Sequence, residues 1–203
     1  MTLLDLSADL GLIAVGFITA NLCIGLLIAM RYSPVRCWPH RRFDVFRLHR
    51  WTAYGASIFL VLHPAVLLWL KKPRFRMLDV LIPVWSPNQP LWNTVGAIAL
   101  YLLAIVVASS ILRVRVGRHW WRLLHWLNYP AAAALFLHGV FTDPDLKGAR
   151  VDYLDGEKVY IELCLLAVLV LSLVRWRYQV RKDRLERARH IGRYAHSEDA
   201  VAG

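Results

Sequence analysis

Long runs of hydrophobic residues alternate with short polar segments rich in arginine along the chain. Five of these runs have about the 20 residues that an α-helix needs to cross the hydrocarbon core of a membrane. They cover residues 10–30, 51–70, 91–112, 121–141 and 159–176. The pattern predicts an all-α membrane protein, a bundle of five transmembrane helices. The fourth run is the weakest, because it contains His125, Asn128, Pro130 and His138.

Lys and Arg are divided unequally between the two sides that five spans define. Eighteen fall in residues 31–50, 113–122 and from 175 onward, whereas seven fall in 71–76 and 147–158. Cytoplasmic loops carry the excess of positive charge in membrane proteins. We therefore expect the N-terminus outside and the C-terminus in the cytoplasm.

The loop over residues 71–90 mixes basic residues with apolar ones and contains Pro83, Pro87 and Pro90. Prolines interrupt helices, so a full span is not expected here. An interfacial helix or a re-entrant cap fits this composition. The tail from Arg175 onward is strongly basic and is expected to form a surface helix.

Composition narrows the class of protein further. The net charge of +11 would suit a nucleic-acid-binding protein, but the basic residues sit at the ends of apolar runs, where they face cytoplasm and anionic lipid. Cys23, Cys37 and Cys164 lack metal-ligand spacing and predict no disulfide framework. The first ten residues contain no Lys or Arg, so we do not expect a signal peptide.

Four of the eight histidines fall within two predicted spans. His49 and His125 stand at the cytoplasmic starts of the second and fourth spans. His63 follows His49 by 14 residues, about 21 Å along a helix, and His138 follows His125 by 13 residues, about 19.5 Å. Because the two spans run in the same direction, His49 pairs with His125 at one depth, and His63 with His138 at another.

Two histidine pairs at two depths are suited to two stacked haems, each iron held by one imidazole from each helix. Two axial imidazoles leave no open iron position, so such a haem carries electrons and no catalytic residue is predicted. The alternative is that these histidines are hydrogen-bonded packing residues. Polar residues inside a membrane are costly and usually functional, which favours ligation of metal.

The interval of 13 residues raises a geometric difficulty. Fourteen residues return nearly to the same helix face, whereas thirteen end about 140° away. The fourth helix therefore needs a distortion, or the two haems are rotated relative to each other. Pro130 lies between His125 and His138 and is expected to supply a kink.

Haem propionates need cationic or donor partners near the membrane faces. We expect them among basic residues that flank the histidine spans. The cofactor-binding candidates are Arg47, Arg50, Arg118, His119 and Arg122 on the cytoplasmic side and Lys71 on the outer side. Contact with lipid headgroups is the alternative for each of them.

Two segments carry a resemblance to a known family: HRWTAYGASIFLVLH, residues 49–63, and GRHWWRLLHWLNYPAAAALFLH, residues 117–138. They resemble the ferric-reductase-like transmembrane domain of ferric reductases, NADPH oxidases and the membrane subunit of the bacterial periplasmic methionine sulfoxide reductase system. The resemblance spans about residues 31–176. It implies a helical bundle, two b-type haems between the second and fourth spans, and electron flow from the cytoplasm outward in a bacterial inner membrane.

The resemblance also divides the chain into an N-terminal transmembrane helix, 1–30, the bis-haem domain, 31–176, and a basic cytoplasmic tail, 177–203. Relatives often have six spans, so six is the alternative to five. The oxidases and large reductases carry a flavin and nicotinamide domain after the last span, and we expect none here. Electrons would then come from a separate flavoprotein reductase or from a quinol.

Three functions stay open from the sequence. The leading one is electron transfer to an extracytoplasmic acceptor such as ferric iron, oxygen or a partner reductase. The second is a membrane anchor cytochrome b of a multi-subunit dehydrogenase that exchanges electrons with quinone. The third is a transporter or scaffold without haem.

Overall fold

The computed structural model describes residues 2–31, 44–142 and 153–202, with side chains described up to residue 188. Every regular element in this part of the chain is helical. Cys37 and most of the loop predicted over residues 31–50 lie outside the described residues.

Four helices in the described residues are long and apolar enough to cross a membrane. They are α1 (Leu3–Ala29), α3 with its 3-10 extension (Val45–Trp69), α5 (Pro90–Ile111) and the first part of α9 (Gly156–Ala188). They correspond to the first, second, third and fifth predicted spans. The all-helical, multi-pass character of the protein is thereby confirmed.

The starts of these helices follow from local capping. The Thr2 hydroxyl accepts a hydrogen bond from the Asp5 amide at 3.1 Å, and the Asp5 carboxylate accepts one from the Thr2 amide. Asp44 caps α3 by accepting from the amides of Phe46 and Arg47. Such caps satisfy amides that have no partner within the helix.

The fourth predicted span is two helices, α7 (Arg118–His125) and α8 (Asn128–Phe141). The distortion expected near Pro130 lies one turn earlier, at Trp126 and Leu127. Proline has no amide hydrogen to give to the carbonyl four residues before it. The Trp126 carbonyl instead accepts from the Tyr129 amide at 3.1 Å, so the helix tightens there and α7 and α8 are separate.

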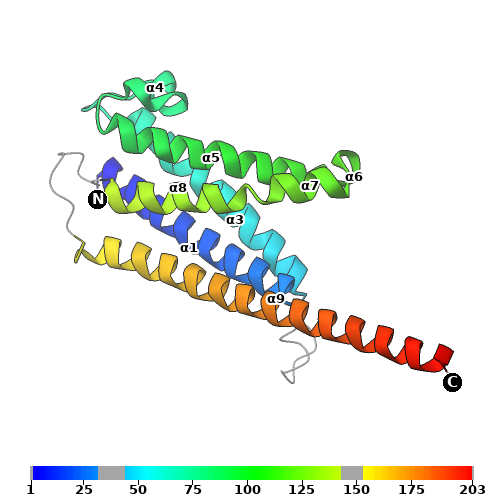
Figure 1. The fold of residues 1–203 in the computed structure, drawn as a ribbon. Helices are drawn as coiled ribbons and strands as arrows, with labels where there is room; N and C mark the ends of the chain where they lie inside the picture. The colour runs from blue at the N-terminus through cyan, green and yellow to red at the C-terminus, as the bar shows by residue number, and fades with distance from the viewer. Residues whose placement is uncertain (1, 32–43, 143–152, 203) are drawn as a thin grey trace.

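The helices pack as two antiparallel pairs with a fifth helix beside them. Helix α1 packs along α3, α5 packs along α8, and α9 lies against α1 and α8 (Figure 1). The helices α3 and α8, which carry the four histidines of interest, make few direct backbone approaches to each other.

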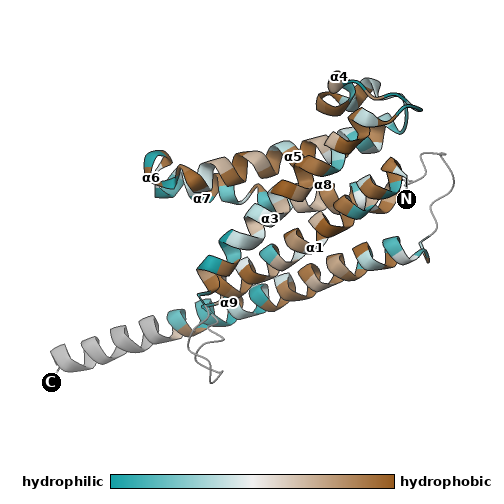
Figure 2. Ribbon diagram, turned by 180° about the vertical axis from the view of Figure 1, so that it is seen from behind, coloured by the Kyte–Doolittle hydropathy of each residue, from teal (hydrophilic) through white to brown (hydrophobic). Residues whose placement is uncertain are grey.

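Small and branched apolar residues fill the centre of the bundle. The buried cluster consists of Val15, Ile18, Ala56, Ala99, Ala132, Leu135, Phe136, Ile161 and Val168. The outward faces of the same helices are also apolar, as in Ile58 and Val61, which are 58% and 57% exposed (Figure 2). An apolar exterior around a small core is expected for a bundle surrounded by lipid.

The loop over residues 71–90 forms a compact cap over one end of the bundle. It contains α4 (Met77–Leu81) and the 3-10 turn η2 (Pro83–Trp85). Phe75 of this loop is buried, and Asn93 of α5 donates hydrogen bonds to the Ser86 hydroxyl and the Asn88 carbonyl. The tail from Arg175 is helical, as expected, and it continues α9 without a break to Ala202, beyond the bundle (Figure 1).

Candidate functional site

The four histidines of the second and fourth predicted spans meet in two pairs, one between α3 and α7 and the other between α3 and α8. The ring centres of His49 and His125 are 6.5 Å apart, with an angle of 64° between the ring planes. The ring centres of His63 and His138 are 6.1 Å apart, with an angle of 74°. The pairing by depth that the sequence predicts is the pairing that the structure contains.

Both separations match two imidazoles on one metal ion. A metal bonded at about 2 Å to one nitrogen of each ring places the ring centres about 6–6.5 Å apart. In the described residues, no group of three or more His, Cys, Asp or Glu side chains could hold a metal ion. In a haem site of this kind the protein provides only two axial histidine ligands, because the porphyrin nitrogens supply the others. The residues present therefore fit a haem at each pair.

Three of the four rings are held by a backbone carbonyl of a neighbouring helix. The Nδ1 atom of His49 lies 3.2 Å from the Asn21 carbonyl, and that of His63 lies 2.7 Å from the Ser7 carbonyl. The Nδ1 atom of His138 lies 2.8 Å from the Trp92 carbonyl.

A carbonyl only accepts, so each Nδ1 carries the hydrogen, and Nε2 keeps the lone pair that a metal requires. Metal-bound histidines nearly always donate their second nitrogen in this way. The carbonyl partners of His49, His63 and His138 therefore assign these rings the tautomer that metal ligands have.

Polar side chains on α1 bind back to the same histidine residues. The Ser7 hydroxyl donates to the His63 carbonyl at 2.8 Å, and the Asn21 amide donates to the His49 carbonyl at 2.6 Å. Sequence reasoning missed both residues. A signal was present, since Ser7 and Asn21 are 14 residues apart, the same interval that separates His49 from His63.

His125 differs from the other three histidines. Its Nδ1 atom is buried and has no hydrogen-bond partner in the part of the chain that the structure describes. The ring of Trp121, one turn earlier, lies 5.1 Å from the His125 ring. Buried polar groups without a hydrogen-bond partner are rare and usually have a reason. The Nδ1 atom therefore distinguishes His125 from the other three histidines.

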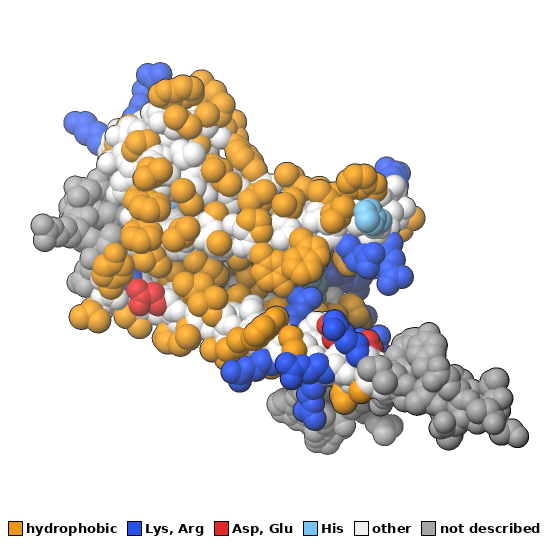
Figure 3. Space-filling model, in the orientation of Figure 1, with side chains coloured by type: hydrophobic (Ala, Val, Ile, Leu, Met, Phe, Trp, Pro, Cys, Tyr) orange, Lys and Arg blue, Asp and Glu red, His pale blue; other side chains and the backbone are white. Residues whose placement is uncertain are grey.

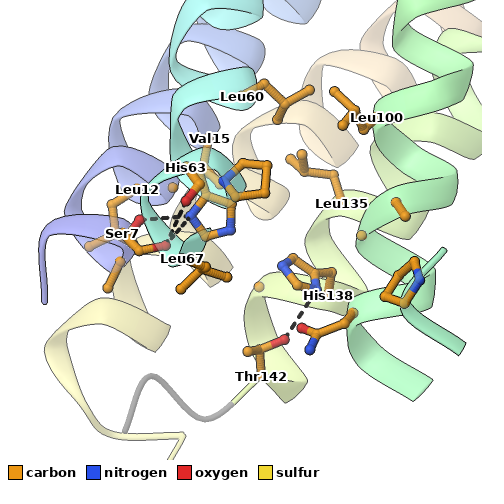
Figure 4. Close-up of a pocket in the computed structure, with 18 of the residues that line it drawn as sticks. Ser7, Leu12, Val15, Leu60, His63, Leu67, Leu100, Leu135, His138 and Thr142 are labelled. Atoms are coloured by element: carbon orange, nitrogen blue, oxygen red, sulfur yellow. Dashed lines mark hydrogen bonds between the residues drawn. The ribbon is translucent and has the colours of Figure 1, made fainter. Parts of the chain in front are cut away.

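A cavity of about 180 Å³ lies beside His63 and His138. The two side chains reach it from opposite walls, while Ser7 and Thr142 bond to their outer nitrogens (Figure 4). The cap over residues 71–90 contributes Phe75, Val80 and Pro83 to the lining. This arrangement is a mostly apolar pocket with few polar groups, which is typical of cofactor sites.

Among the described residues, Lys158 is the one Lys or Arg that lines this cavity. It is 6% exposed, and its ammonium group donates to the carbonyls of Gly139 and Thr142 at the end of α8. A cation is favourable at the C-terminal end of a helix, where carbonyls lack partners. The sequence analysis did not select Lys158, because its contact with α8 depends on tertiary packing.

The residues predicted to hold propionates are exposed. Arg47, Arg50, Lys71, Arg118, His119 and Arg122 all have exposed side chains and do not line the cavity beside His63 and His138. Lys and Arg side chains gather around the α6–α7 end of the molecule and along α9 (Figure 3). Propionate binding by these residues stays a prediction.

A protein-family model described as "Ferric reductase like transmembrane component" matches residues 10–136 of this chain. The chain belongs to that family. The matched segment contains His49, His63 and His125, and it ends two residues before His138. Searches of curated proteins and of solved structures found no match to this chain.

Membership in the ferric reductase-like family implies transmembrane electron transfer and suggests haem as the cofactor. Haem would supply reversible one-electron chemistry at the histidine pairs. Backbone carbonyls hold the imidazoles of His49, His63 and His138 in one tautomer, and all four rings face each other in two pairs. They also surround the pairs with apolar side chains.

Replacing Pro130 with alanine is expected to disturb one histidine pair of this ferric reductase-like chain. An alanine amide can bond to the Trp126 carbonyl and straighten the junction of α7 and α8. A straight helix would turn His138 about 140° away from the face of His125. We expect the haem content of this variant to fall, as measured by haem-to-protein ratio.

Pro90→Ala is the matched control. Pro90 is the first residue of α5, where the missing amide hydrogen has no partner to lose. Equal haem loss in both variants would mean that any proline substitution damages the bundle. The junction of α7 and α8 would then have no special role.

Proposed function

We propose that this protein carries electrons across a bacterial inner membrane through two b-type haems. One is bound by His49 and His125 near the cytoplasm, and the other by His63 and His138 near the outer face. The observation that carries the proposal is the presence of two histidine pairs at ligating separation, one between α3 and α7 and the other between α3 and α8. A bilayer core is about 30 Å thick, so two relay centres at different depths shorten each electron step.

The direction is proposed from the distribution of charge. The His49 end of the bundle carries exposed arginines on α6, α7 and α9, and such an excess of positive charge is typical of a cytoplasmic face. Electrons would therefore enter at the His49–His125 pair. They would leave at the His63–His138 pair toward ferric iron, oxygen or a partner reductase.

The donor in this proposal is a separate flavoprotein reductase. Exposed cations at the His49 end, among them Arg115 and Arg177, would attract an acidic protein surface. Complementary charge of this kind mainly accelerates encounter and depends on ionic strength. The exposed aromatic residues Trp120 and Trp126 on the same end offer additional contact area.

Charge reversal at this end tests the docking site. In Arg115→Glu/Arg177→Glu, haem reduction by an acidic flavoprotein reductase is expected to slow about tenfold at low salt. The difference should shrink at high salt, because screening removes steering. The measurement is the stopped-flow rate of haem reduction.

The control carries the same reversal at the opposite end, in Arg74→Glu/Arg76→Glu, whose side chains are also exposed. It should be reduced at the unmodified rate. Equal slowing in both variants would reject docking at the His49 end.

A membrane anchor cytochrome b that exchanges electrons with quinone is the second candidate. A quinol added to the purified protein would then reduce the haems at a catalytically useful rate without any flavoprotein. Reduction that requires the flavoprotein would favour the first candidate.

A further inference from the structure

Three of the four paired histidines lie directly against a glycine of the neighbouring helix. A Cβ atom added at Gly11 would come within 3.0 Å of His63 Nδ1, and one at Gly96 within 2.8 Å of His138 Nδ1. A Cβ atom at Gly25 would come within 3.3 Å of His49 Cε1. Any side chain at these positions would press on the imidazole ring.

Each of these glycines follows the carbonyl that binds the same histidine by four residues. Ser7 precedes Gly11, Asn21 precedes Gly25, and Trp92 precedes Gly96 by that interval. In an α-helix, the side chain at position i+4 leans back toward the N-terminus and covers the preceding turn. Glycine leaves that turn open, so a ring can reach the second lone pair of the carbonyl at position i.

We propose that Gly11, Gly25 and Gly96 are positioning residues for the haem ligands. Each forms, with the carbonyl one turn before it, a seat that receives an imidazole, takes its Nδ1 hydrogen and aims Nε2 at the opposite histidine. The inference rests on the proposed function, because it assumes that the histidines bind haem iron. Glycine weakens a helix interior, so its presence at three such places calls for a local reason.

The register of the seats supports this reading. On α1, the two seats are 14 residues apart, from Ser7 to Asn21 and from Gly11 to Gly25. The same interval separates His49 from His63 on α3. The sequence repeat on one helix therefore matches the ligand repeat on the other, which chance packing of small residues does not require.

His125 provides the contrast. Fourteen residues after Trp92 and Gly96, α5 has Val106 and Ser110. The Ser110 hydroxyl donates to the Val106 carbonyl at 2.7 Å and accepts from the Trp121 indole at 3.3 Å. The equivalent carbonyl is thus already bonded and has no glycine beside it. His125 Nδ1 has no partner among the described residues.

The seats should therefore tune the two haems differently. Donation from Nδ1 to a carbonyl raises the basicity of a ligand and fixes its orientation. The His63–His138 pair has two seated rings, whereas the His49–His125 pair has one. A more basic ligand favours the higher charge on iron. Loss of a seat should therefore weaken the binding of ferric haem more than that of ferrous haem.

The test compares Gly11→Ala, Gly25→Ala and Gly96→Ala in the full-length purified protein. The readouts are haem content and the midpoint potential of each haem from a spectroelectrochemical titration. His63→Ala, which should keep only the other haem, assigns the signals. Gly55→Ala is the matched control, because its Cβ would meet the Phe17 ring at 2.8 Å without touching a ligand.

We expect Gly25→Ala to affect only the His49–His125 haem, and Gly11→Ala and Gly96→Ala only the other. Removal of such a support typically weakens metal binding about 10- to 100-fold. A tenfold loss confined to the ferric state raises a one-electron potential by about 59 mV. Gly55→Ala should leave both potentials unchanged.

The proposal would be overturned if every variant shifted the midpoint potentials of both haems, or if Gly55→Ala gave equal shifts. Gly25→Ala places its Cβ farthest from the imidazole ring. If Gly11→Ala and Gly96→Ala do not fold, this variant alone tests the proposal. Wild-type protein without two haems would instead reject the proposed function. Wild-type protein with two haems and no site-selective shift would reject the seats alone.

Discussion

His63→Ala and His138→Ala are each expected to lower the haem content by about half, because one iron loses an axial ligand while the other pair stays complete. His49→Ala and His125→Ala should remove the other half. The two sets of variants should lose different components of the reduced spectrum. Haem-to-protein ratio and low-temperature absorption spectra of the purified variants measure both effects.

The double variant His63→Ala/His138→Ala sharpens this expectation. Two ligands of one iron act as a unit, so their effects should not add. The double variant should keep as much haem as either single variant. A double variant with no haem, beside single variants that each keep half, would mean that the two histidines serve different haems.

Electron transfer across a membrane is expected to stop when either haem is removed. In vesicles that enclose ferricyanide, externally added dithionite should reduce the contents rapidly through the wild-type protein. In His63→Ala or His125→Ala vesicles, the rate should fall to that of protein-free vesicles. The hydrocarbon core of the membrane is about 30 Å thick, so a single haem leaves much of that distance without an electron carrier.

Lys182→Met is a suitable control for this assay. Lys182 forms a partly exposed ion pair with Glu186 on α9, at 3.6 Å, and such pairs contribute little to stability. The variant should transfer electrons at the wild-type rate. Undiminished transfer in a variant that retains one haem would contradict a two-step relay.

Hydrophobic run length was sufficient to predict four of the five spans, and histidine spacing was sufficient to predict which histidines pair. Both depend on the rise of an α-helix per residue, which hardly varies with context. The distortion near Pro130 was also predictable, since proline removes a specific amide hydrogen. Its position at Trp126 and Leu127 depends on which alternative bonds the backbone finds, and a sequence pattern does not define that.

The supports of the histidines could not be predicted in the same way. The carbonyls of Ser7, Asn21 and Trp92 become acceptors only when α1 and α5 pack in a particular register. Lys158 contacts the end of α8 for the same reason. These contacts arise from tertiary packing, and only the shared 14-residue interval on α1 and α3 gave a sequence signal for them.

The most direct test is the absorption spectrum and haem-to-protein ratio of the purified wild-type chain. The sequence has no C-x-x-C-H motif for covalent haem attachment, so the haem should be extractable and of the b type. We predict two haems per chain, both low-spin with two axial histidines, in the oxidised and reduced states. A colourless protein, or one haem per chain, would contradict the two-haem relay.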